Sequence, residues 1–485
     1  MDQQRLLTGI PELDVVLRGG LLAGRIHLIE GVPGTGKTTF GLRFLIDGAD
    51  RGESLLYITL SETKAELQAT ARSHDWSIEA INIEEMIPAE AQIEAHQTVL
   101  FPEGVELNAT IKAILDLISK HRPARVVIDS MAELRLLASD AASYRRQIIA
   151  LRQFLLAQQC TAVLLDDLTS DTREHDLQGS VHGVISLEQR ERSFGSARRR
   201  LRVVKMRGAD FQSGWHDFAI VKREVLVFPS LIADEHHAEY KREPVSCDVP
   251  ELDGMLGGGL MRGTSTVIQG PTGVGKSSLS LQYAIAGAER GEHVAYFSFD
   301  ETLETLFDRA KGLNIDIHAP IEDGTIHWER INPSRISPGE FIWKVRRQVE
   351  KEKARIVIID SLNSYLETMQ EEDALILQMH ELFTYLNHQG IVCILVLGQA
   401  SGSAEAVDPL GVTLISDTVI LMHYFEQNGS IKKTIHVVKK RPGQHACAVF
   451  EYLLTPHGVG IGKPVHNEMP MVHGHSTVST SKNAG

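Results

Sequence analysis

The chain has 485 residues, of which 43% are hydrophobic and 23% charged, and its formal net charge is −14. This composition is typical of a globular protein, and the acidic balance argues against a surface that binds nucleic acid over its whole extent. No apolar run approaches the ~20 residues of a membrane helix, and the N-terminus lacks the apolar core of a signal peptide. The four cysteines are scattered along the chain, which indicates buried thiols in a reducing cytoplasm.

The first predicted strand, residues 26–29, leads into Gly31-Val32-Pro33-Gly34-Thr35-Gly36-Lys37-Thr38, which fits the phosphate-loop pattern G-x-x-x-x-G-K-[ST]. An apolar stretch at helical spacing follows, so the loop has the strand–loop–helix context that the motif requires. Glycines allow backbone N–H groups to point at phosphate oxygens, the lysine reaches the outer phosphates, and the threonine hydroxyl can ligate Mg²⁺. The predicted phosphate-binding residues are Gly31, Gly34, Thr35, Gly36, Lys37, Thr38 and Thr39.

Two further predicted strands end in acidic residues. The strand 54–60 precedes Ser61-Glu62-Thr63, where the Glu62 carboxylate could orient or deprotonate an attacking water. The alternative is a helix start, with Ser61 as the N-cap and the acid favouring the helix dipole. The aliphatic run 125–128 ends in Asp129-Ser130 and is typical of a central parallel strand. An aspartate there could hold Mg²⁺ through water, although an ordinary Asp-Ser turn gives the same pattern.

The same series of elements recurs in the second half of the chain. A second phosphate loop follows the predicted strand 266–268, and its lysine, Lys276, lies 239 residues after Lys37 (276 − 37 = 239). The predicted strand 293–299 is followed by two acids, and the predicted strand 355–359 also ends in an aspartate. The candidate residues of this copy are Gly270, Gly273, Val274, Gly275, Lys276, Ser277 and Ser278 for phosphate, Ser277 and Asp360 for Mg²⁺, and Asp300 and Glu301 for positioning water, with Asp300 also a candidate N-cap.

A repeat of this period is too long for a solenoid and indicates two whole domains in tandem. We predict an α/β fold with a mostly parallel sheet flanked by helices in each domain, at residues 1–232 and 248–463. Residues 233–247 are polar and lack periodicity, which indicates a linker, and residues 464–485 have the composition of a disordered tail. The pair His236-His237 could bind a metal ion, but solvated linker histidines are the more ordinary interpretation.

The paired loops, the Gly-Gly-Leu segments at 19–21 and 258–260, and the strands V-V-I-D-S and V-I-I-D-S together resemble the KaiC family of the RecA superfamily. The resemblance covers about residues 6–462 and implies two tandem RecA-like P-loop NTPase domains that bind ATP and Mg²⁺. It also implies a homo-hexamer of two stacked rings, with nucleotide held between neighbouring subunits.

A K-x-R-G element of the family matches Lys205-Met206-Arg207-Gly208, and Lys439-Lys440-Arg441 stands at the equivalent place in the second copy. The resemblance therefore implies that Lys205, Arg207, Lys439 and Arg441 reach the phosphates of the adjoining subunit. Such cations would stabilise charge on the transferring phosphoryl group and couple hydrolysis to assembly. From the sequence alone, a basic strand edge facing water and a nucleic-acid patch are the alternatives.

The chain departs from the clock members of this family at two places. Those members carry adjacent glutamates where this chain has Ser61-Glu62 and Asp300-Glu301, so slow hydrolysis is expected in the first domain. They also carry neighbouring phosphate acceptors in the second domain, which align with Thr413 and Leu414. A leucine cannot be phosphorylated, so Thr413 is the candidate phosphoacceptor and an ordered two-site cycle is not expected.

The leading hypothesis is a cytoplasmic, hexameric, KaiC-like ATPase whose nucleotide-driven conformation signals to a protein partner, with autophosphorylation in the second domain. One alternative is a Ser/Thr autokinase that uses Thr413 as its acceptor. Another is a RadA-like DNA recombination or repair ATPase, which the basic run 198–207 supports and the acidic overall charge opposes. The last is a scaffold whose nucleotide is structural. No membrane association is expected.

Overall fold

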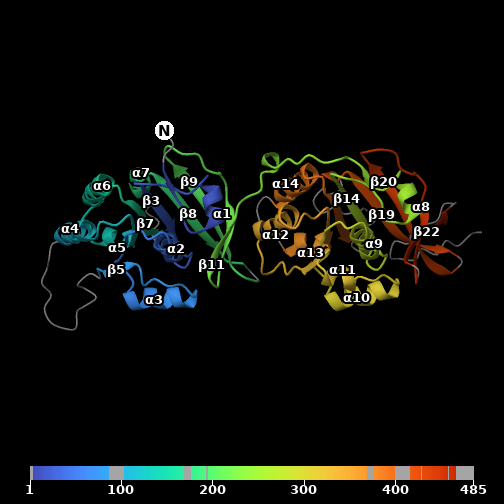
Figure 1. Cartoon of the computed structure of the whole chain (residues 1–485), viewed down its shortest axis with the longest axis horizontal. Helices are drawn as coiled ribbons and strands as arrows, with labels where there is room; N and C mark the ends of the chain where they lie inside the picture. Colours follow the sequence, from blue (N-terminus) through green and yellow to red (C-terminus); the bar gives the residue numbers. More distant parts are fainter. Residues whose placement is uncertain are drawn as a thin grey trace, which may run out of the picture. The chain divides into compact units, whose positions relative to one another are not determined.

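The computed structural model describes residues 4–86, 103–168, 176–192, 195–368, 375–398, 415–427, 429–456 and 458–465. The chain forms two compact units, residues 1–230 and 231–485 (Figure 1).

The helices and strands of the first unit alternate along most of its length, as the sequence pattern predicts. Its strands are β1 Arg5–Leu6, β2 Leu21–Leu22, β3 Ile26–Gly31, β4 Leu55–Thr59, β5 Asn82–Glu85, β6 Arg125–Asp129, β7 Thr161–Asp167, β8 Gly183–Arg190, β9 Arg198–Met206, β10 His216–Val221 and β11 Glu224–Phe228. Its helices are α1 Pro11–Val16, α2 Lys37–Asp50, α3 Lys64–Ser73, α4 Glu103–His121, α5 Met131–Leu136, α6 Ala141–Ala157 and α7 Asp176–Ser180.

The second unit repeats this series. Its strands are β12 Pro244–Val245, β13 Leu260–Met261, β14 Thr264–Gly270, β15 Val294–Ser298, β16 Ile326–Arg330, β17 Ile356–Asp360, β18 Val392–Gly398, β19 Thr418–Gln427, β20 Ser430–Lys440, β21 Phe450–Thr455 and β22 Gly458–Pro464. Its helices are the 3₁₀ helix η2 Ala233–Glu235, α8 Pro250–Met255, α9 Lys276–Glu289, α10 Leu303–Gly312, α11 His318–Glu322, α12 Pro338–Glu350, α13 Leu362–Thr368 and α14 Leu375–His388.

The main sheets of the two units have the same strand order. Among the described residues each has nine strands, in the order β11-β10-β9-β8-β3-β7-β6-β4-β5 in the first unit and β22-β21-β20-β19-β14-β18-β17-β15-β16 in the second. The six strands from β8 to β5, and from β19 to β16, run parallel, and the remaining strands form an antiparallel extension. The predicted fold class, two tandem α/β domains with mostly parallel sheets flanked by helices, is therefore confirmed.

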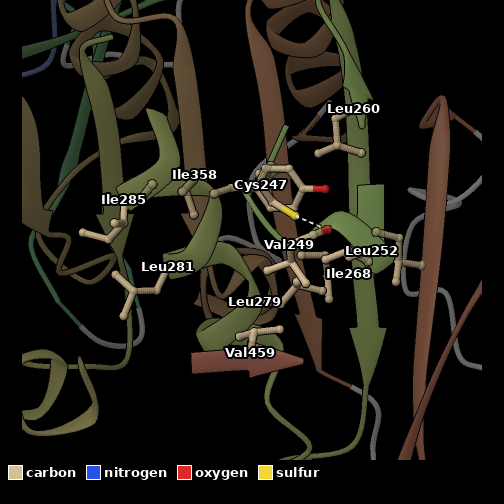
Figure 2. Close-up of a cluster of buried hydrophobic side chains, with 14 of the residues drawn as sticks. Cys247, Val249, Leu252, Leu260, Ile268, Leu279, Leu281, Ile285, Ile358 and Val459 are labelled. Atoms are coloured by element: carbon tan, nitrogen blue, oxygen red, sulfur yellow. Dashed lines mark hydrogen bonds between the residues drawn. The ribbon is translucent and has the colours of Figure 1, made fainter. Parts of the chain in front are cut away.

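Each main sheet is buried on both faces, because its central strands are continuous aliphatic runs. In the first unit one face packs on α1, α2 and α3 and the other on α4 and α6. In the second unit α8, α9 and α10 cover one face, and α12 and α14 cover the other. Figure 2 shows the first of these second-unit clusters, where aliphatic side chains surround Cys247. Burial there raises the pKa of the Cys247 thiol to about 12.

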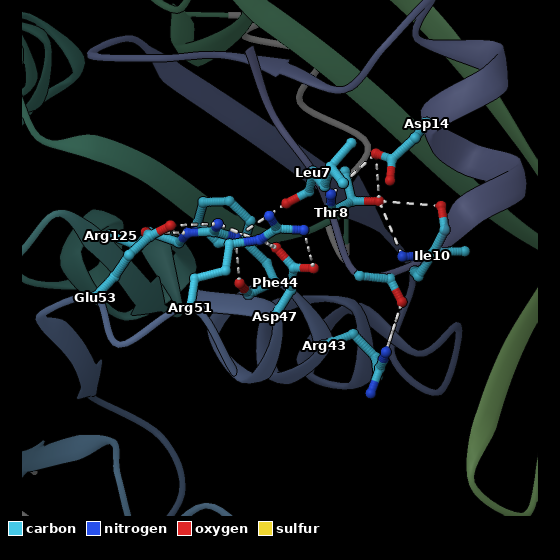
Figure 3. A network of polar contacts seen from close by, with 11 residues as sticks. Leu7, Thr8, Ile10, Asp14, Arg43, Phe44, Asp47, Arg51, Glu53 and Arg125 are labelled. Atoms are coloured by element: carbon cyan, nitrogen blue, oxygen red, sulfur yellow. Dashed lines mark hydrogen bonds and ion pairs between the residues drawn. The ribbon is translucent and has the colours of Figure 1, made fainter. Parts of the chain in front are cut away.

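A buried cation joins the start of the first unit to its sheet (Figure 3). Arg125, with 0% of its side chain exposed, donates to both carboxylate oxygens of Glu53 at 2.6 and 2.9 Å and to Asp47 at 3.0 Å. It also donates to the carbonyls of Leu7 and Phe44 at 2.9 and 2.8 Å. All its hydrogen-bonding directions are used, which is the condition for burying a guanidinium without a large desolvation penalty.

Residues 233–247, predicted as a linker, begin with η2 and include β12, which pairs with β13. Between them the backbone is held on α14, since Ala238 N donates to the carbonyl of His388 at 3.1 Å. The predicted tail begins at the last residue of β22, and residues 466–485 lie outside the described residues.

Candidate active sites

The first phosphate loop lies between β3 and α2. Gly36 is the N-cap of α2 and has a φ of 105°, in the left-handed region that favours glycine. Thr35 tightens the loop by donating its hydroxyl hydrogen to the carbonyl of Val32 at 2.8 Å. Lys37 folds back over the loop, where its Nζ donates to the carbonyls of Gly31 and Val32 at 3.0 and 3.1 Å. The backbone N–H groups at the helix start and this cation form a suitable site for an anion.

The second loop has the same geometry between β14 and α9. Gly275 caps α9 with a φ of 113°, and Lys276 Nζ donates to the carbonyls of Gly270 and Pro271, each at 2.9 Å. Burial lowers the pKa of Lys276, and Asp360 opposes this shift. Two loops that are so alike in backbone conformation fit the same phosphate chemistry.

The predicted Mg²⁺ residues come together in the first unit. Thr38 Oγ1 donates to Asp129 Oδ2 at 2.9 Å, and Tyr57 OH donates to the same oxygen at 2.6 Å. Burial raises the pKa of the Asp129 carboxyl, an effect that the two hydroxyl donors oppose. A hydroxyl and a carboxylate beside the phosphate loop are the oxygen ligands that suit Mg²⁺.

The second unit repeats the tyrosine contact, because Tyr296 OH donates to Asp360 Oδ2 at 2.6 Å. Sequence reasoning did not identify Tyr57 and Tyr296 as site residues. The signal was present, since the two tyrosines are separated by the same 239 residues as the two loop lysines (296 − 57 = 239). Each one fixes its aspartate by a buried hydroxyl, so these tyrosines position the predicted metal-binding carboxylates.

The Glu62 carboxylate lies among other acids and keeps one buried oxygen, Oε2, without a hydrogen-bond partner in the described structure. Burial raises its pKa, and the nearby carboxylates Asp129, Glu66 and Asp167 raise it further. The helix cap is Thr63, whose hydroxyl accepts from Glu66 N, so the prediction that Ser61 caps this helix is wrong. The Glu62 side chain is therefore available to a water molecule.

The two acids of the second unit have partners. Glu301 accepts from Arg309 at 2.5 Å, which opposes the rise that burial causes in the Glu301 pKa. Asp300 accepts from Ser361 at 2.7 Å and from Ser364 at 2.5 Å. The prediction that Asp300 caps this helix is also wrong, because the hydroxyl of Thr302 caps α10.

These second-unit residues border one cleft of about 510 Å³. Its lining includes the predicted residues Gly273, Gly275, Lys276, Ser277, Ser278, Asp300, Glu301 and Asp360. The structure thus brings the phosphate, metal and water-positioning candidates of this copy to one place at the carboxyl ends of the parallel strands.

Asp167, at the end of β7, is a charged site residue that sequence reasoning missed. Its Oδ1 pairs with Lys37 Nζ at 2.5 Å. In the second unit the same register position, opposite the first glycine of the loop, is occupied by Gly398. Lys37 therefore has a carboxylate partner from β7, whereas Gly398 at the equivalent position cannot supply a carboxylate to Lys276. An aspartate after an aliphatic strand in only one copy was the available signal.

Lys205 and Arg207 lie away from the phosphate loop of their own unit. Lys205 pairs in the sheet with Val184 of β8, and Val184 pairs with Leu28 of β3. The phosphate loop begins three residues after Leu28, at Gly31. Lys205 Nζ and Arg207 donate to carbonyls of α7.

The second pair of cations repeats this placement. Lys439 pairs in the sheet with Val419 of β19, and Val419 pairs with Val267 of β14. The Nζ of Lys439 donates to the carbonyl of Ser416 at 2.7 Å. Arg441 faces Asp417 at 3.5 Å. Neither unit brings these cations to its own loop.

Comparison with known proteins identifies the family of the chain. The family model described as "ATPase: KaiC" matches twice, at residues 6–232 and 245–466. The chain belongs to the KaiC ATPase family.

Several curated proteins of this family are similar along nearly the whole chain. The circadian clock protein KaiC3 of Synechocystis sp. is 26% identical over 477 residues, which cover 96% of this chain and 93% of that protein. The circadian clock oscillator protein KaiC of Parathermosynechococcus lividus is 26% identical over 467 residues, covering 94% and 84%. That of Synechococcus elongatus is 24% identical over 481 residues, covering 98% and 92%.

Each KaiC family match contains one phosphate loop and one Tyr–Asp pair, so family membership applies to both units. Within the part of the chain that the structure describes, no helix combines the length and apolar character needed to cross a bilayer. The candidate phosphoacceptor Thr413 lies outside the described residues.

Proposed function

We propose that both units bind ATP with Mg²⁺ and that the chain assembles into a homo-hexamer with nucleotide between neighbouring subunits. The observation that carries the proposal is the position of the cations in the sheet. At ~3.3 Å per residue, Lys205 lies about 10 Å behind Gly31 along the strand direction, as does Lys439 behind Gly270. A phosphate on one loop can meet these cations if they belong to the adjacent subunit.

Within each site the residues have distinct tasks. Lys37 and Lys276 exchange their loop carbonyls for the outer phosphates, and Thr38 with Asp129, or Ser277 with Asp360, holds Mg²⁺. The ion neutralises charge on the phosphate oxygens when it is bound. Cations from the neighbouring subunit stabilise the negative charge that develops on the transferring phosphoryl group.

Glu62 is the proposed water-positioning residue of the first unit. Its unpartnered oxygen and raised pKa are the properties expected of a carboxylate that accepts a proton from water. In the second unit Glu301 must share its carboxylate with Arg309, and the neighbouring Asp300 is the second candidate. Hydrolysis in the first unit therefore depends on Glu62 alone, which is consistent with a slow reaction there.

Two variants test which site hydrolyses and which supports assembly. Lys37→Ala and Lys276→Ala remove one loop cation at a time, and phosphate release together with light scattering reports on each remaining site. We expect each variant to lose nucleotide at its own unit, with ATP-dependent assembly reduced in at least one of them. If neither variant changes phosphate release or mass, the proposal is wrong.

A mixing experiment tests the shared site directly. Both proteins carry Lys276→Ala, and one also carries Lys37→Ala whereas the other carries Arg207→Ala. A mixed ring therefore contains some interfaces at which Lys37 of one subunit meets Arg207 of the next. We expect the mixture to hydrolyse ATP faster than the sum of the two separate proteins. Activity equal to that sum would show that Arg207 does not act across an interface. A mixture of two Lys37→Ala preparations is the matched control.

Signalling through a protein partner in the cytoplasm and autophosphorylation at Thr413 complete the proposal. Its support is family membership and, for the compartment, four free cysteines, of which three are buried. Equal labelling of wild type and Thr413→Ala by γ-labelled ATP would exclude Thr413 as the acceptor. For the RadA-like alternative, two arginines of the basic run, Arg200 and Arg202, lie over the ring of Trp215 at 4.1 and 4.7 Å.

A further inference from the structure

We propose that Asp234, His237 and His388 form a binding site for a divalent transition-metal ion such as Zn²⁺. Their ligand atoms all lie within 4.8 Å of one another, and no other group of three potential ligands was found in the described ranges. Two imidazole nitrogens and one carboxylate oxygen favour zinc, cobalt or nickel over Mg²⁺ or Ca²⁺, which prefer oxygen ligands alone. The site is separate from both phosphate loops and lies within the second unit.

The imidazole of His388 is already oriented by its surroundings. It lies in the last turn of α14, and its Nδ1 is 3.3 Å from the carbonyl of Ala233. When Nδ1 donates to this carbonyl, Nε2 carries the lone pair, which is the usual arrangement for a metal-bound histidine. The ring of His237 lies against it, with centroids 4.1 Å apart and planes inclined by 28°. Small rotations about the side-chain torsions bring both rings to one ion.

The backbone around these ligands is fixed by contacts that do not depend on a metal. Ala238 N donates to the carbonyl of His388 at 3.1 Å, and Gln389 Nε2 donates to the carbonyl of His236 at 3.0 Å. At the other end of the segment, Ala233 N donates to Glu381 at 2.9 Å. The exposed residues Asp234 and His237 are therefore held beside α14, which lowers the entropy that a metal must overcome on binding.

The consequence of binding is a cross-link between residues 234–237 and the end of α14. Asp234 and His237 belong to residues 233–247, the segment between the two repeats, whereas His388 belongs to α14 of the second repeat. A bound ion stabilises this segment on the second unit by mass action.

The test is Zn²⁺ titration of the full chain by calorimetry, with Mg²⁺-ATP in excess so that the phosphate loops do not bind zinc. The parent protein carries His473→Ala and His475→Ala, which removes two histidines near the end of the printed sequence that are also potential zinc ligands. We expect His237→Ala to weaken binding at least about tenfold, because loss of even an outer-shell partner costs 10–100-fold. Asp234→Asn, which leaves the orientation of His388 intact, is the second ligand variant and should also weaken binding.

His236→Ala is the matched control, because His236 is the neighbour of His237 but packs against Tyr385. It should keep the affinity of the parent. Limited proteolysis gives an independent measurement: Zn²⁺ should slow cleavage within residues 233–247 in the parent and in His236→Ala but not in His237→Ala. Equal Zn²⁺ affinity in the parent and in His237→Ala, or equal loss in His236→Ala, would overturn the assignment. Zinc binding without protection from the protease would overturn the cross-link.

Discussion

Replacement of Asp167 by asparagine should increase the affinity of the first unit for ATP. In the structure the Asp167 carboxylate pairs with Lys37 Nζ at 2.5 Å, so an incoming phosphate must displace it. Asparagine has nearly the same shape but no charge. The substitution removes the competitor for Lys37 and also a negative charge that would repel the triphosphate.

The degree of burial sets the size of the effect. The side chains of Lys37 and Asp167 are 7% and 27% exposed, so this pair is neither fully exposed nor fully buried. Exposed pairs contribute up to ~1 kcal/mol, and breaking a buried pair costs about 3–5 kcal/mol. An intermediate free-energy change of ~1–2 kcal/mol corresponds to about 5–30-fold tighter binding of ATP.

The assay is titration with a fluorescent ATP analogue in a Lys276→Ala background, so that the first unit alone reports. Asp167→Glu is the control, since it keeps the charge and should bind ATP much as the parent does. Unchanged or weaker binding by Asp167→Asn would refute the competition and would instead place Asp167 among the groups that hold the bound nucleotide or its metal ion.

Three further predictions concern the first unit. Gly36→Ala forces an alanine to a φ of 105° and should lower the free energy of unfolding by about 1–3 kcal/mol in denaturant titrations, whereas Gly179→Ala, which meets no atom within 4 Å, should not. Arg125→Ile leaves Asp47 and Glu53 without their buried cation and should cost about 3–5 kcal/mol in the unfolding of this unit. Glu62 acts as a base in its ionised form, and its pKa is raised. On acidification of a Lys276→Ala protein, the rate of ATP hydrolysis should therefore begin to fall at a higher pH than it would with a glutamate of ordinary pKa. The pH–rate profile checks this, and Glu62→Gln should remove this acidic fall in rate.

The strand–loop–helix units could be predicted because local sequence and tertiary environment favour the same structure there. Aliphatic runs gave the central strands β3, β6, β14 and β17 to within one or two residues, and glycine at the helix start allowed the loop backbone. The Asp-Ser motifs were likewise found at the expected strand ends. These are the features that depend on neighbours in sequence.

Long-range side-chain contacts could not be predicted from local pattern. Tyr57 and Asp129 are 72 residues apart and meet because β4 and β6 are adjacent in the sheet. His237 and His388 are 151 residues apart (388 − 237 = 151) and meet because residues 233–238 fold back on α14. The helix caps were missed for a different reason, since serine, threonine and aspartate compete at the same helix start and backbone conformation decides between them.

The two copies share one backbone but differ in which of two equivalent groups, the loop lysine or the candidate glutamate, has a charged partner. In the first unit the loop lysine has the carboxylate of Asp167, and among the described residues no cation pairs with the catalytic candidate Glu62. In the second unit the lysine has Gly398 at that position, and Glu301 is paired with Arg309. A carboxylate beside the lysine disfavours a bound triphosphate, and a cation beside the glutamate weakens it as a base. The second unit should therefore hold ATP more tightly and the first should release it more readily. An order of affinities opposite to this in the two single-loop variants would mean that contacts across the subunit interface outweigh the charges within each pocket.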